Sequence, residues 1–92
     1  MDAISPASPG PRPTPSVVAR RVGNGGVLVH LGTSHVYELN ETGWAVWEGL
    51  DRGAPVIEIA AGLADRYEPA GVSIIADVHA LIAELRRLGL VV

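Results

Sequence analysis

The sequence predicts an α+β fold of the winged helix-turn-helix-like kind, in which a three-stranded antiparallel β-sheet is followed by three α-helices. Between residues 17 and 39, apolar residues alternate with period two and are interrupted by glycine-containing turns. After residue 40, apolar residues recur with the period of a helix, in three segments separated by Gly and Pro. The two halves meet in Leu39–Leu50, where a strand end runs directly into a capped helix.

The first two strands are expected to form a hairpin. Val17–Val22 is rich in β-branched residues. Gly23–Gly26 follows and contains an Asn-Gly dipeptide, which favours tight hairpin turns because both residues tolerate positive φ. Residues 27–31 then alternate between two faces. Because the glycine cluster precedes a strand and no Gly-Lys-Ser/Thr follows it, we interpret it as a turn and not as a phosphate-binding loop.

A third strand is expected over residues 35–39, after a second short turn. Alternation places Tyr37 and Leu39 on one face of this strand, and Val36 and Glu38 on the other. A three-stranded meander of this kind leaves at least one edge strand unpaired.

The first helix is expected over residues 41–50. Asn40 is a suitable N-cap, because its side-chain oxygen can accept a hydrogen bond from a backbone N–H two or three residues later. Glu41 then places a negative charge in the first turn, which suits the helix dipole. The stripe expected to face the core is Val46, Trp47 and Leu50. Trp44 falls off this stripe, so we expect it to be more exposed than Trp47 and available for a contact.

Two further helices are expected after Asp51-Arg52-Gly53 ends the first one. Pro55 suits the first turn of the second helix, where a missing N–H costs nothing. The apolar stripe of this helix is Val56, Ile59, Ala60, Leu63 and Tyr67. The third helix is expected over residues 73–88, with Gly89 at the C′ position. Its stripe is Ile74, Ile75, Val78, Leu81, Ile82, Leu85 and Leu88. Residues 90–92 should pack back or add a short strand.

Residues 1–15 are expected to be a disordered, proline-rich tail, and residues 16–92 to be the folded domain. Five prolines lie in the first segment, at positions 6, 9, 11, 13 and 15, with mostly Ser, Ala and Gly between them. Such a segment cannot bury enough apolar surface to offset the entropy lost on ordering. It also has neither the basic start nor the apolar run of a signal peptide.

The composition argues against several classes of function. The chain has no cysteine, so it has no disulfide framework and no thiolate metal site. The absence of cysteine and of a signal peptide favours the cytoplasm. A net charge of −3 argues against nucleic acid as a partner. No apolar segment approaches the length of a membrane span, so no membrane association is expected.

No arrangement of catalytic, cofactor-binding or metal-binding residues is evident. His30, His35 and His79 show no i, i+4 helical spacing and have no cysteine to complete a metal site. The acidic residues of the later helices are Glu58, Asp65, Asp77 and Glu84. We interpret them as a solvated face and not as acid–base pairs. The expected protein is therefore not an enzyme and uses no cofactor.

A DNA-binding regulator is an alternative function for a winged-helix topology. In such a protein the last helix would carry basic and amide side chains for the major groove. The polar residues on the third helix include Asp77, His79, Glu84, Arg86 and Arg87. This set is mixed in sign and nearly neutral, so a DNA reader or another interaction module is the less favoured hypothesis.

An ordered set of short motifs runs through the whole folded part. They are Leu39-Asn40-Glu41-Thr42-Gly43, Trp47-Glu48, Asp51-Arg52-Gly53, Ile57-Glu58, Leu63-Ala64-Asp65-Arg66-Tyr67, Asp77-Val78, Leu81, Leu85 and Gly89-Leu90-Val91. With these motifs in this order, the chain resembles the PqqD family over about residues 17–92. Members of this family are also called precursor recognition elements of RiPPs, the ribosomally synthesised and modified peptides. The chain is similar to free-standing members that serve lasso-peptide clusters.

Two positions depart from the family pattern. Val36-Tyr37 stands where an aromatic pair is usual, and Ala54 stands where Ser or Thr usually precedes the second helix. Neither change threatens the fold. The change at Val36 would alter the peptide preference.

The resemblance implies a non-catalytic function. Family members bind the leader segment of a precursor peptide, which adds as a strand to the open third strand, in a groove whose other wall is the third helix. An open strand offers main-chain hydrogen bonds for affinity, and alternate side chains enter pockets for specificity. The implied partners are the precursor peptide and modifying enzymes such as a leader peptidase, a cyclase or a radical enzyme. Lasso-peptide and pyrroloquinoline quinone pathways both fit, and Thr42-Gly43 favours the former.

The resemblance also implies a set of peptide-binding residues. On the third strand they are Val36, Tyr37, Glu38 and Leu39. On the third helix, 100° per residue places Asp77, Leu81, Glu84 and Leu88 along one border of the apolar stripe. The other border, which is the alternative, holds Ile75, His79, Ile82 and Arg86. We expect the Asp77 border to face the strand, because an acidic rim beside Leu81 could receive a basic or polar leader.

Overall fold

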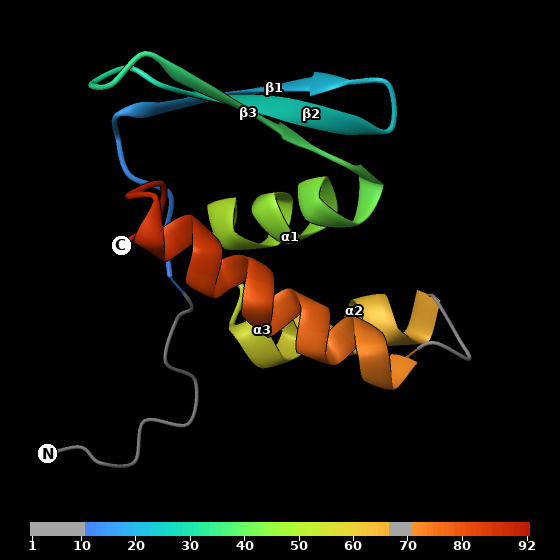
Figure 1. The fold of residues 1–92 in the computed structure, drawn as a ribbon. Helices are drawn as coiled ribbons and strands as arrows, with labels where there is room; N and C mark the ends of the chain where they lie inside the picture. Colours follow the sequence, from blue (N-terminus) through green and yellow to red (C-terminus); the bar gives the residue numbers. More distant parts are fainter. Residues whose placement is uncertain (1–10, 67–70) are drawn as a thin grey trace, which may run out of the picture.

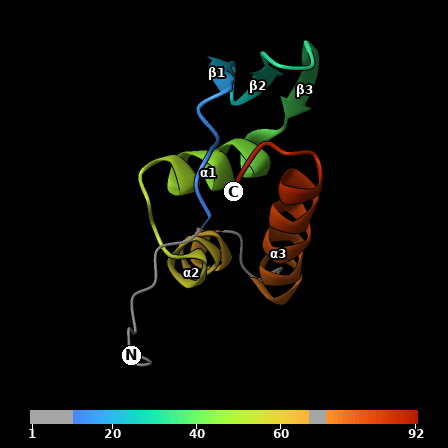
Figure 2. The same cartoon turned by 90° about the vertical axis from the view of Figure 1, so that its left-hand side faces the viewer.

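The computed structural model describes residues 11–66 and 71–92, which form a β-sheet on one side and three helices beneath it (Figures 1 and 2). The strands are β1 (Val17–Val22), β2 (Gly25–His30) and β3 (His35–Leu39). The helices are α1 (Glu41–Asp51), α2 (Val56–Arg66) and α3 (Gly71–Arg87). The predicted α+β fold, with three antiparallel strands followed by three helices, is confirmed.

The sheet is an antiparallel meander with the order β1-β2-β3. Val22 pairs with Gly25, so the turn between β1 and β2 has two residues, Gly23 and Asn24. Gly23 has a φ of 60°, whereas Asn24 does not adopt positive φ. Positive φ at the first central residue alone is the type II′ pattern. The hairpin was therefore predicted correctly, but through the wrong dipeptide, because Gly25 already belongs to β2.

Helix α1 lies between the sheet and the other two helices (Figure 2). Its sheet side contacts β2 and β3, and its other side contacts α2 and α3. Val46 and Leu50 are fully buried, and Trp47 is 3% exposed, as their stripe predicts. A helix covered from two directions must be apolar around more of its circumference than a helix at the surface.

Trp44 is the residue for which the expectation from sequence was wrong. It is only 8% exposed and belongs to the core. The six-membered part of its ring lies against Gly26 of β2, where a Cβ would stand within 2.6 Å of Trp44 Cζ3. The missing side chain at Gly26 therefore leaves the space that the indole occupies. The sheet thus covers a side of α1 that a single apolar stripe leaves open.

The remaining helices pack mainly against each other and complete the core. The buried residues of α2 and of the described part of α3 are Ile59, Ala60, Leu63, Val78, Ile82 and Leu85. Tyr67, predicted on the same stripe, lies outside the described residues. Ile75 was also predicted to face the core but is 40% exposed, since it lies at the border of the stripe. Leu90 and Val91 are buried, as expected for a chain end that packs back.

The N-terminal segment is held in place from residue 12 onward, contrary to the tail expected over residues 1–15. Arg12 N–H donates to Val92 O at 3.2 Å, and Val92 N–H donates back to Arg12 O at 2.9 Å. Thr14 N–H donates to Leu90 O at 3.1 Å, and Pro13 forms a bridge with Val91. The prediction failed because the buried chain end offers backbone groups that a polar, proline-rich segment can satisfy. Residues 1–10 lie outside the described residues.

Two truncated chains should show how much each part of the N-terminal segment contributes to the free energy of unfolding. Deletion of residues 1–10 is expected to leave the free energy of unfolding unchanged, whereas deletion of residues 1–14 should lower it by about 2 kcal/mol, because four backbone hydrogen bonds are lost, three of them to the chain end. Urea denaturation of both variants measures the difference. Equal stability of the two truncated chains would show that the pairing with the chain end contributes nothing.

Candidate functional site

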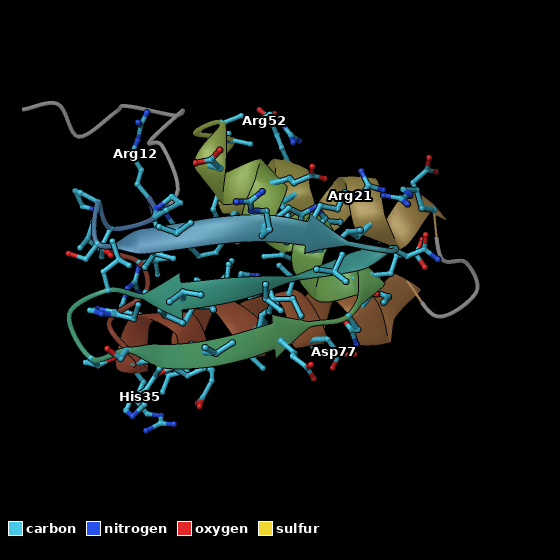
Figure 3. All side chains as sticks on the ribbon, turned by 90° about the horizontal axis from the view of Figure 1, so that it is seen from above. Arg12, Arg21, His35, Arg52 and Asp77 are labelled. Carbon is cyan, nitrogen blue, oxygen red and sulfur yellow. The ribbon has the colours of Figure 1, made fainter. Side chains whose placement is uncertain are left out.

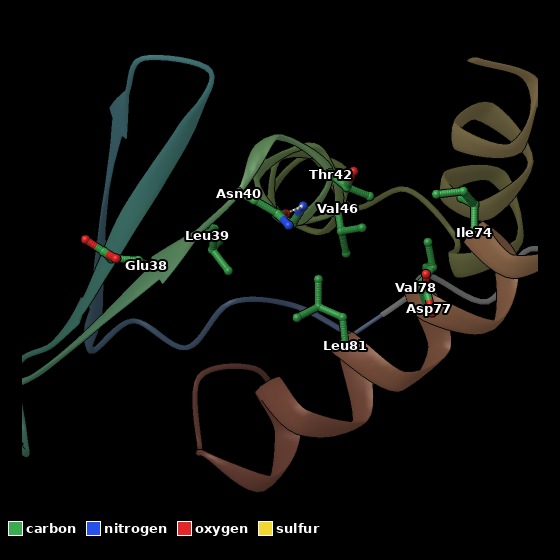
Figure 4. A pocket seen from close by; sticks show the side chains of 10 residues that line it. Glu38, Leu39, Asn40, Thr42, Val46, Ile74, Asp77, Val78 and Leu81 are labelled. Carbon is green, nitrogen blue, oxygen red and sulfur yellow. Dashed lines mark hydrogen bonds between the residues drawn. The ribbon is translucent and has the colours of Figure 1, made fainter. Parts of the chain in front are cut away.

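An open groove lies between the end of β3, the first turns of α1 and the middle of α3 (Figure 4). Its volume is about 390 Å³. The lining residues are Glu38, Leu39, Asn40, Thr42, Gly43, Val46, Ile74, Asp77, Val78 and Leu81. Four of the eight predicted peptide-binding residues are among them: Glu38, Leu39, Asp77 and Leu81.

The groove is apolar inside and polar at its rim. Val46 and Val78 are buried at its base. Leu39 and Leu81, each partly buried, extend toward one another from β3 and α3 (Figure 4). The exposed carboxylate of Asp77 stands at the rim. Such a groove can accept an apolar side chain of a peptide and hold a cationic or hydrogen-bonding group at its edge.

The N-terminus of α1 shapes one wall of the groove. Asn40 has extended backbone angles, and its Oδ1 accepts from Gly43 N–H at 2.8 Å, so the predicted N-cap is confirmed. A Cβ at Gly43 would stand 3.3 Å from both Asn40 Oδ1 and Leu39 Cδ2. The glycine therefore lets the strand end and the helix start approach closely. This turn fixes where Leu39 enters the groove.

The directions of the backbone groups in β2 follow from one hydrogen bond. Leu31 N–H donates to Ser16 O at 2.8 Å, so residue 31, just after β2, turns its backbone toward the β1 side of the sheet. Successive residues of an antiparallel strand turn their N–H and C=O alternately to the two sides. The residues of β2 that turn toward β3 are therefore Gly26, Leu28 and His30.

The open edge of β3 offers the backbone groups of two residues. The β3 partners of those β2 residues are Leu39, Tyr37 and His35. Val36 and Glu38, which alternate with them, direct their N–H and C=O away from β2. No strand pairs with this edge in the described part of the chain. An incoming extended peptide would find both donors and acceptors there.

The side chains of Val36 and Glu38 do not enter the groove. Both lie on the face of the sheet turned away from the helices, and Val36 is 62% exposed. Figure 4 shows the Glu38 carboxylate turned away from Leu81. Of the predicted strand residues, these two can therefore contribute mainly their backbone, while Tyr37 and Leu39 contribute side chains on the helix-facing side.

The two borders of α3 face different elements. Asp77 and Leu81 line the groove beside β3. Ile75 and His79, from the alternative border, line a separate apolar pocket together with α2 residues. Figure 3 likewise shows Asp77 near the end of β3. Asp77 and Leu81, from the border expected to face the strand, thus lie on the β3 side of the helix, and their contact with a peptide stays a prediction.

The second half of this border carries an ion pair. Arg87 Nε donates to Glu84 Oε1 at 3.0 Å, and Arg87 Nη2 contacts Glu84 Oε2. This hydrogen bond lowers the pKa of Glu84 and raises that of Arg87, which Tyr37 raises further. Because the pKa of Glu84 is lowered, the pair stabilises the fold above the ordinary glutamate pKa and is lost as pH falls. The negative charge of Glu84 is therefore compensated by Arg87, whereas Asp77 has no ion pair within the described residues.

Tyr37 and Leu88 lie partly buried against the core. The Tyr37 hydroxyl is 3.4 Å from His35 Nδ1, and the two rings meet edge to face with centroids 6.2 Å apart. Neither Tyr37, Glu84 nor Leu88 lines the pocket itself.

Sequence reasoning did not select six of the groove residues. They are Asn40, Thr42, Gly43, Val46, Ile74 and Val78. A signal for part of this set was present, because Leu39–Gly43 is one of the motifs that carry the family resemblance. From the sequence alone, Asn40 is interpreted only as the cap of the first helix. In the structure the same turn also forms a wall of the groove.

The described ranges contain neither a cluster of metal-binding side chains nor a membrane-spanning helix. No group of three or more His, Asp or Glu side chains is placed to hold a metal ion in residues 11–66 and 71–92. None of the helices, as far as they are described, is both long and apolar enough to cross a bilayer.

The sequence model of the PqqD family, described as coenzyme PQQ synthesis protein D, matches residues 25–91. This chain belongs to the PqqD family. The match covers the whole groove and confirms the resemblance inferred from the motifs. No curated protein matches the chain.

Two solved structures share the fold of this PqqD family member. TbiB1 in complex with the TbiA(beta) leader peptide superposes with a TM-score of 0.80 at 22% identity, over 87% of this chain and 93% of that one. Lasso peptide synthetase B1 complexed with the leader peptide gives 0.79 at 23% identity, over 89% and 96%. At this level of identity the similarity establishes a common fold.

Proposed function

We propose that the protein binds the leader segment of a ribosomally synthesised precursor peptide and presents it to modifying enzymes, without catalysing a reaction itself. The observation that carries this proposal is the open edge of β3 beside an apolar groove. Family membership and the two structures solved with leader peptides support it.

The leader would bind as a fourth strand. Its backbone would pair with Val36 and Glu38, at the usual strand spacing of about 4.8 Å. Alternate leader side chains would then point to the helix side, where Leu39 and Leu81 border the groove. One apolar residue of the leader would fill the space above Val46 and Val78.

The rim favours a leader with a polar or basic group near this apolar residue. Asp77 is exposed and has no ion pair in the described residues, whereas Glu84 is neutralised by Arg87. One free carboxylate at the rim would attract one cation, with a contribution of about 0.2–1 kcal/mol for an exposed pair.

Among pathways we favour lasso-peptide biosynthesis over pyrroloquinoline quinone biosynthesis, because one of the structures that share the fold is lasso peptide synthetase B1 complexed with the leader peptide. The test is a calorimetric titration of the full chain with the leader of a precursor encoded beside its gene, compared with a pyrroloquinoline quinone precursor. Saturable binding of the first peptide alone is expected. Binding of neither peptide would contradict the proposal.

Substitutions on α3 test the second wall of the groove. Leu81→Asp should weaken leader binding by at least about tenfold, because it places a charge where an apolar side chain would be buried. Asp77→Arg should weaken binding of a basic leader by a smaller factor. Isothermal titration of each variant measures the change.

His79→Asp is the matched control for the α3 substitutions. His79 lies on the same helix but lines the pocket next to α2. We expect its leader affinity to equal that of the unmodified chain. If Leu81→Asp and His79→Asp had equal effects, the groove beside β3 would not be the binding site.

A further inference from the structure

The face of the sheet turned away from the helices is unusually apolar. By strand alternation, with Leu28 fully buried on the inner face, its side chains are Val18, Arg20, Val22, Val27, Val29, Val36 and Glu38. Figure 3 views this face from above, with the helices behind it. An antiparallel sheet with one solvated face normally carries polar residues there. Five valines in seven positions make this face more apolar than a solvated sheet face normally is.

The register arranges six of these side chains in two rows across the sheet, while Val22 pairs with Gly25 and lies outside both rows. Val18 pairs with Val29, and Val29 pairs with Val36, so one row consists of valines alone. Its outer members are 45% and 62% exposed. The valine row thus offers an apolar strip that runs across all three strands.

The neighbouring row carries opposite charges at its two ends. Arg20 pairs with Val27, and Val27 pairs with Glu38. The two charged residues lie two strands apart, about 10 Å between their backbones. No ion pair joins them in the described part of the chain. Each charge is therefore available to a partner.

We propose that this face binds the same face of a second copy of the chain, giving a symmetric dimer with two sheets between two layers of helices. A twofold axis nearly parallel to the strands places β1 of one copy over β3 of the other. Arg20 then faces Glu38 of the second copy, and the reverse pair forms at the other edge. Val27 and Val29 lie near the axis and meet their own equivalents.

The charge pattern is the reason for choosing a second copy over another protein. One row presents a positive and a negative end at equal distances from Val27, so it is complementary to itself under this rotation. Sheets packed face to face lie about 10 Å apart with strands about 30° from parallel, a spacing that two valine layers can fill. The arrangement is isologous, as most homodimer interfaces are.

The size of the face predicts a weak dimer. Three strands of about five residues cover roughly 14 by 17 Å, well below the about 800 Å² per partner of a standard stable interface. We therefore expect a dissociation constant in the range of about 0.1–1 mM. The leader groove lies on the opposite side of the sheet from this face and stays open in the dimer.

Sedimentation equilibrium of the full chain without any peptide tests the proposal, over concentrations from about 20 µM to 2 mM that bracket this constant. We expect a monomer–dimer equilibrium. Arg20→Glu and Glu38→Arg should each weaken it by at least about tenfold, because each places like charges together. The double variant Arg20→Glu/Glu38→Arg should restore it, since both intermolecular pairs reform with exchanged signs.

Uncharged substitutions separate the apolar contribution from the charges. Val29→Thr keeps the β-branched shape but adds a hydroxyl at the centre of the face, and it should weaken the dimer. Ile57→Thr changes an equally apolar residue, 76% exposed on α2, and should have no effect. Circular dichroism and thermal melting establish that each variant is folded.

Two results would overturn the dimer. One is a chain that stays monomeric up to 2 mM, which would leave the valine face to a different partner. The other is failure of the double charge reversal to recover what the single reversals lose. Because no leader is present in these experiments, their outcome does not depend on the proposed peptide binding.

Discussion

Leader binding is expected to be lost in Glu38→Pro and nearly retained in Glu38→Ala. The N–H of Glu38 turns to the open edge of β3, as the register and the Leu31–Ser16 hydrogen bond establish. Proline removes this donor and places its ring where the leader strand would lie. A loss of about 2–3 kcal/mol, or roughly a hundredfold in affinity, follows from one unsatisfied group and the blocked approach. Alanine keeps the backbone and removes only a carboxylate that points away from the groove.

The matched control is a proline on the other edge of the sheet. Arg21 lies in β1, and its backbone N–H turns away from β2, because Arg20 is the neighbour that faces β2 by the same alternation. Arg21→Pro should therefore cost similar local strain without affecting leader binding. Calorimetric titration of the three variants, with melting temperatures measured in parallel, compares affinity at known folding. Normal binding by a folded Glu38→Pro chain would exclude strand addition at β3.

The second large effect concerns the two tryptophans of α1. Trp47→Ala should lower the free energy of unfolding by about 3–5 kcal/mol, because a buried aromatic side chain leaves a cavity. The exposure that the sequence predicts for Trp44 would make Trp44→Ala much less costly. Since Trp44 is also buried, we now expect a loss of about 2–4 kcal/mol. Its Nε1–H is buried and has no hydrogen-bond partner among the described residues, and removing that group offsets part of the loss.

Trp44→Phe tests this account of the buried Nε1–H. Phenylalanine retains an aromatic ring against Gly26 and removes the unpaired donor, so the stability should stay within about 1 kcal/mol of the unmodified chain. Urea denaturation can follow either single-tryptophan variant by the fluorescence of the remaining indole. Because small domains are only marginally stable, the losses must be compared with a variant of unchanged stability. Ile57→Ala, at an exposed position, is that reference. A Trp44→Ala variant as stable as this reference would show that the indole is not packed against the sheet.

Local rules accounted for most of the secondary structure. The Asn40 cap, the alternation in β3 and the helical stripes of α2 and α3 each depend on neighbours within a few residues. Where the sequence was misread, the deciding contact came from far along the chain. Trp44 is buried by β2, and residues 12–14 are ordered by residues 90–92. Neither contact has a signature in the segment that it affects.

The sequence likewise predicted one part of the candidate site, and tertiary packing decided the other part. Motifs along the chain identified the family and selected both walls of the groove, with Leu39 on β3 and Leu81 on α3. They did not determine which border of α3 faces β3, because a helix can be rotated about its axis without any change in its periodicity. The packing of Val78, Ile82 and Leu85 into the core decided that rotation and left Asp77 at the groove.

By itself, the sequence determined the order and type of the elements and the family. Local hydrogen bonding and side-chain period are sufficient for the first of these. Only the tertiary structure decided which backbone groups reach the open edge, what lies in the floor of the groove and that the outer sheet face is apolar across three strands. These features depend on register and packing, because they join residues that are distant in the chain, and no local pattern contains that information.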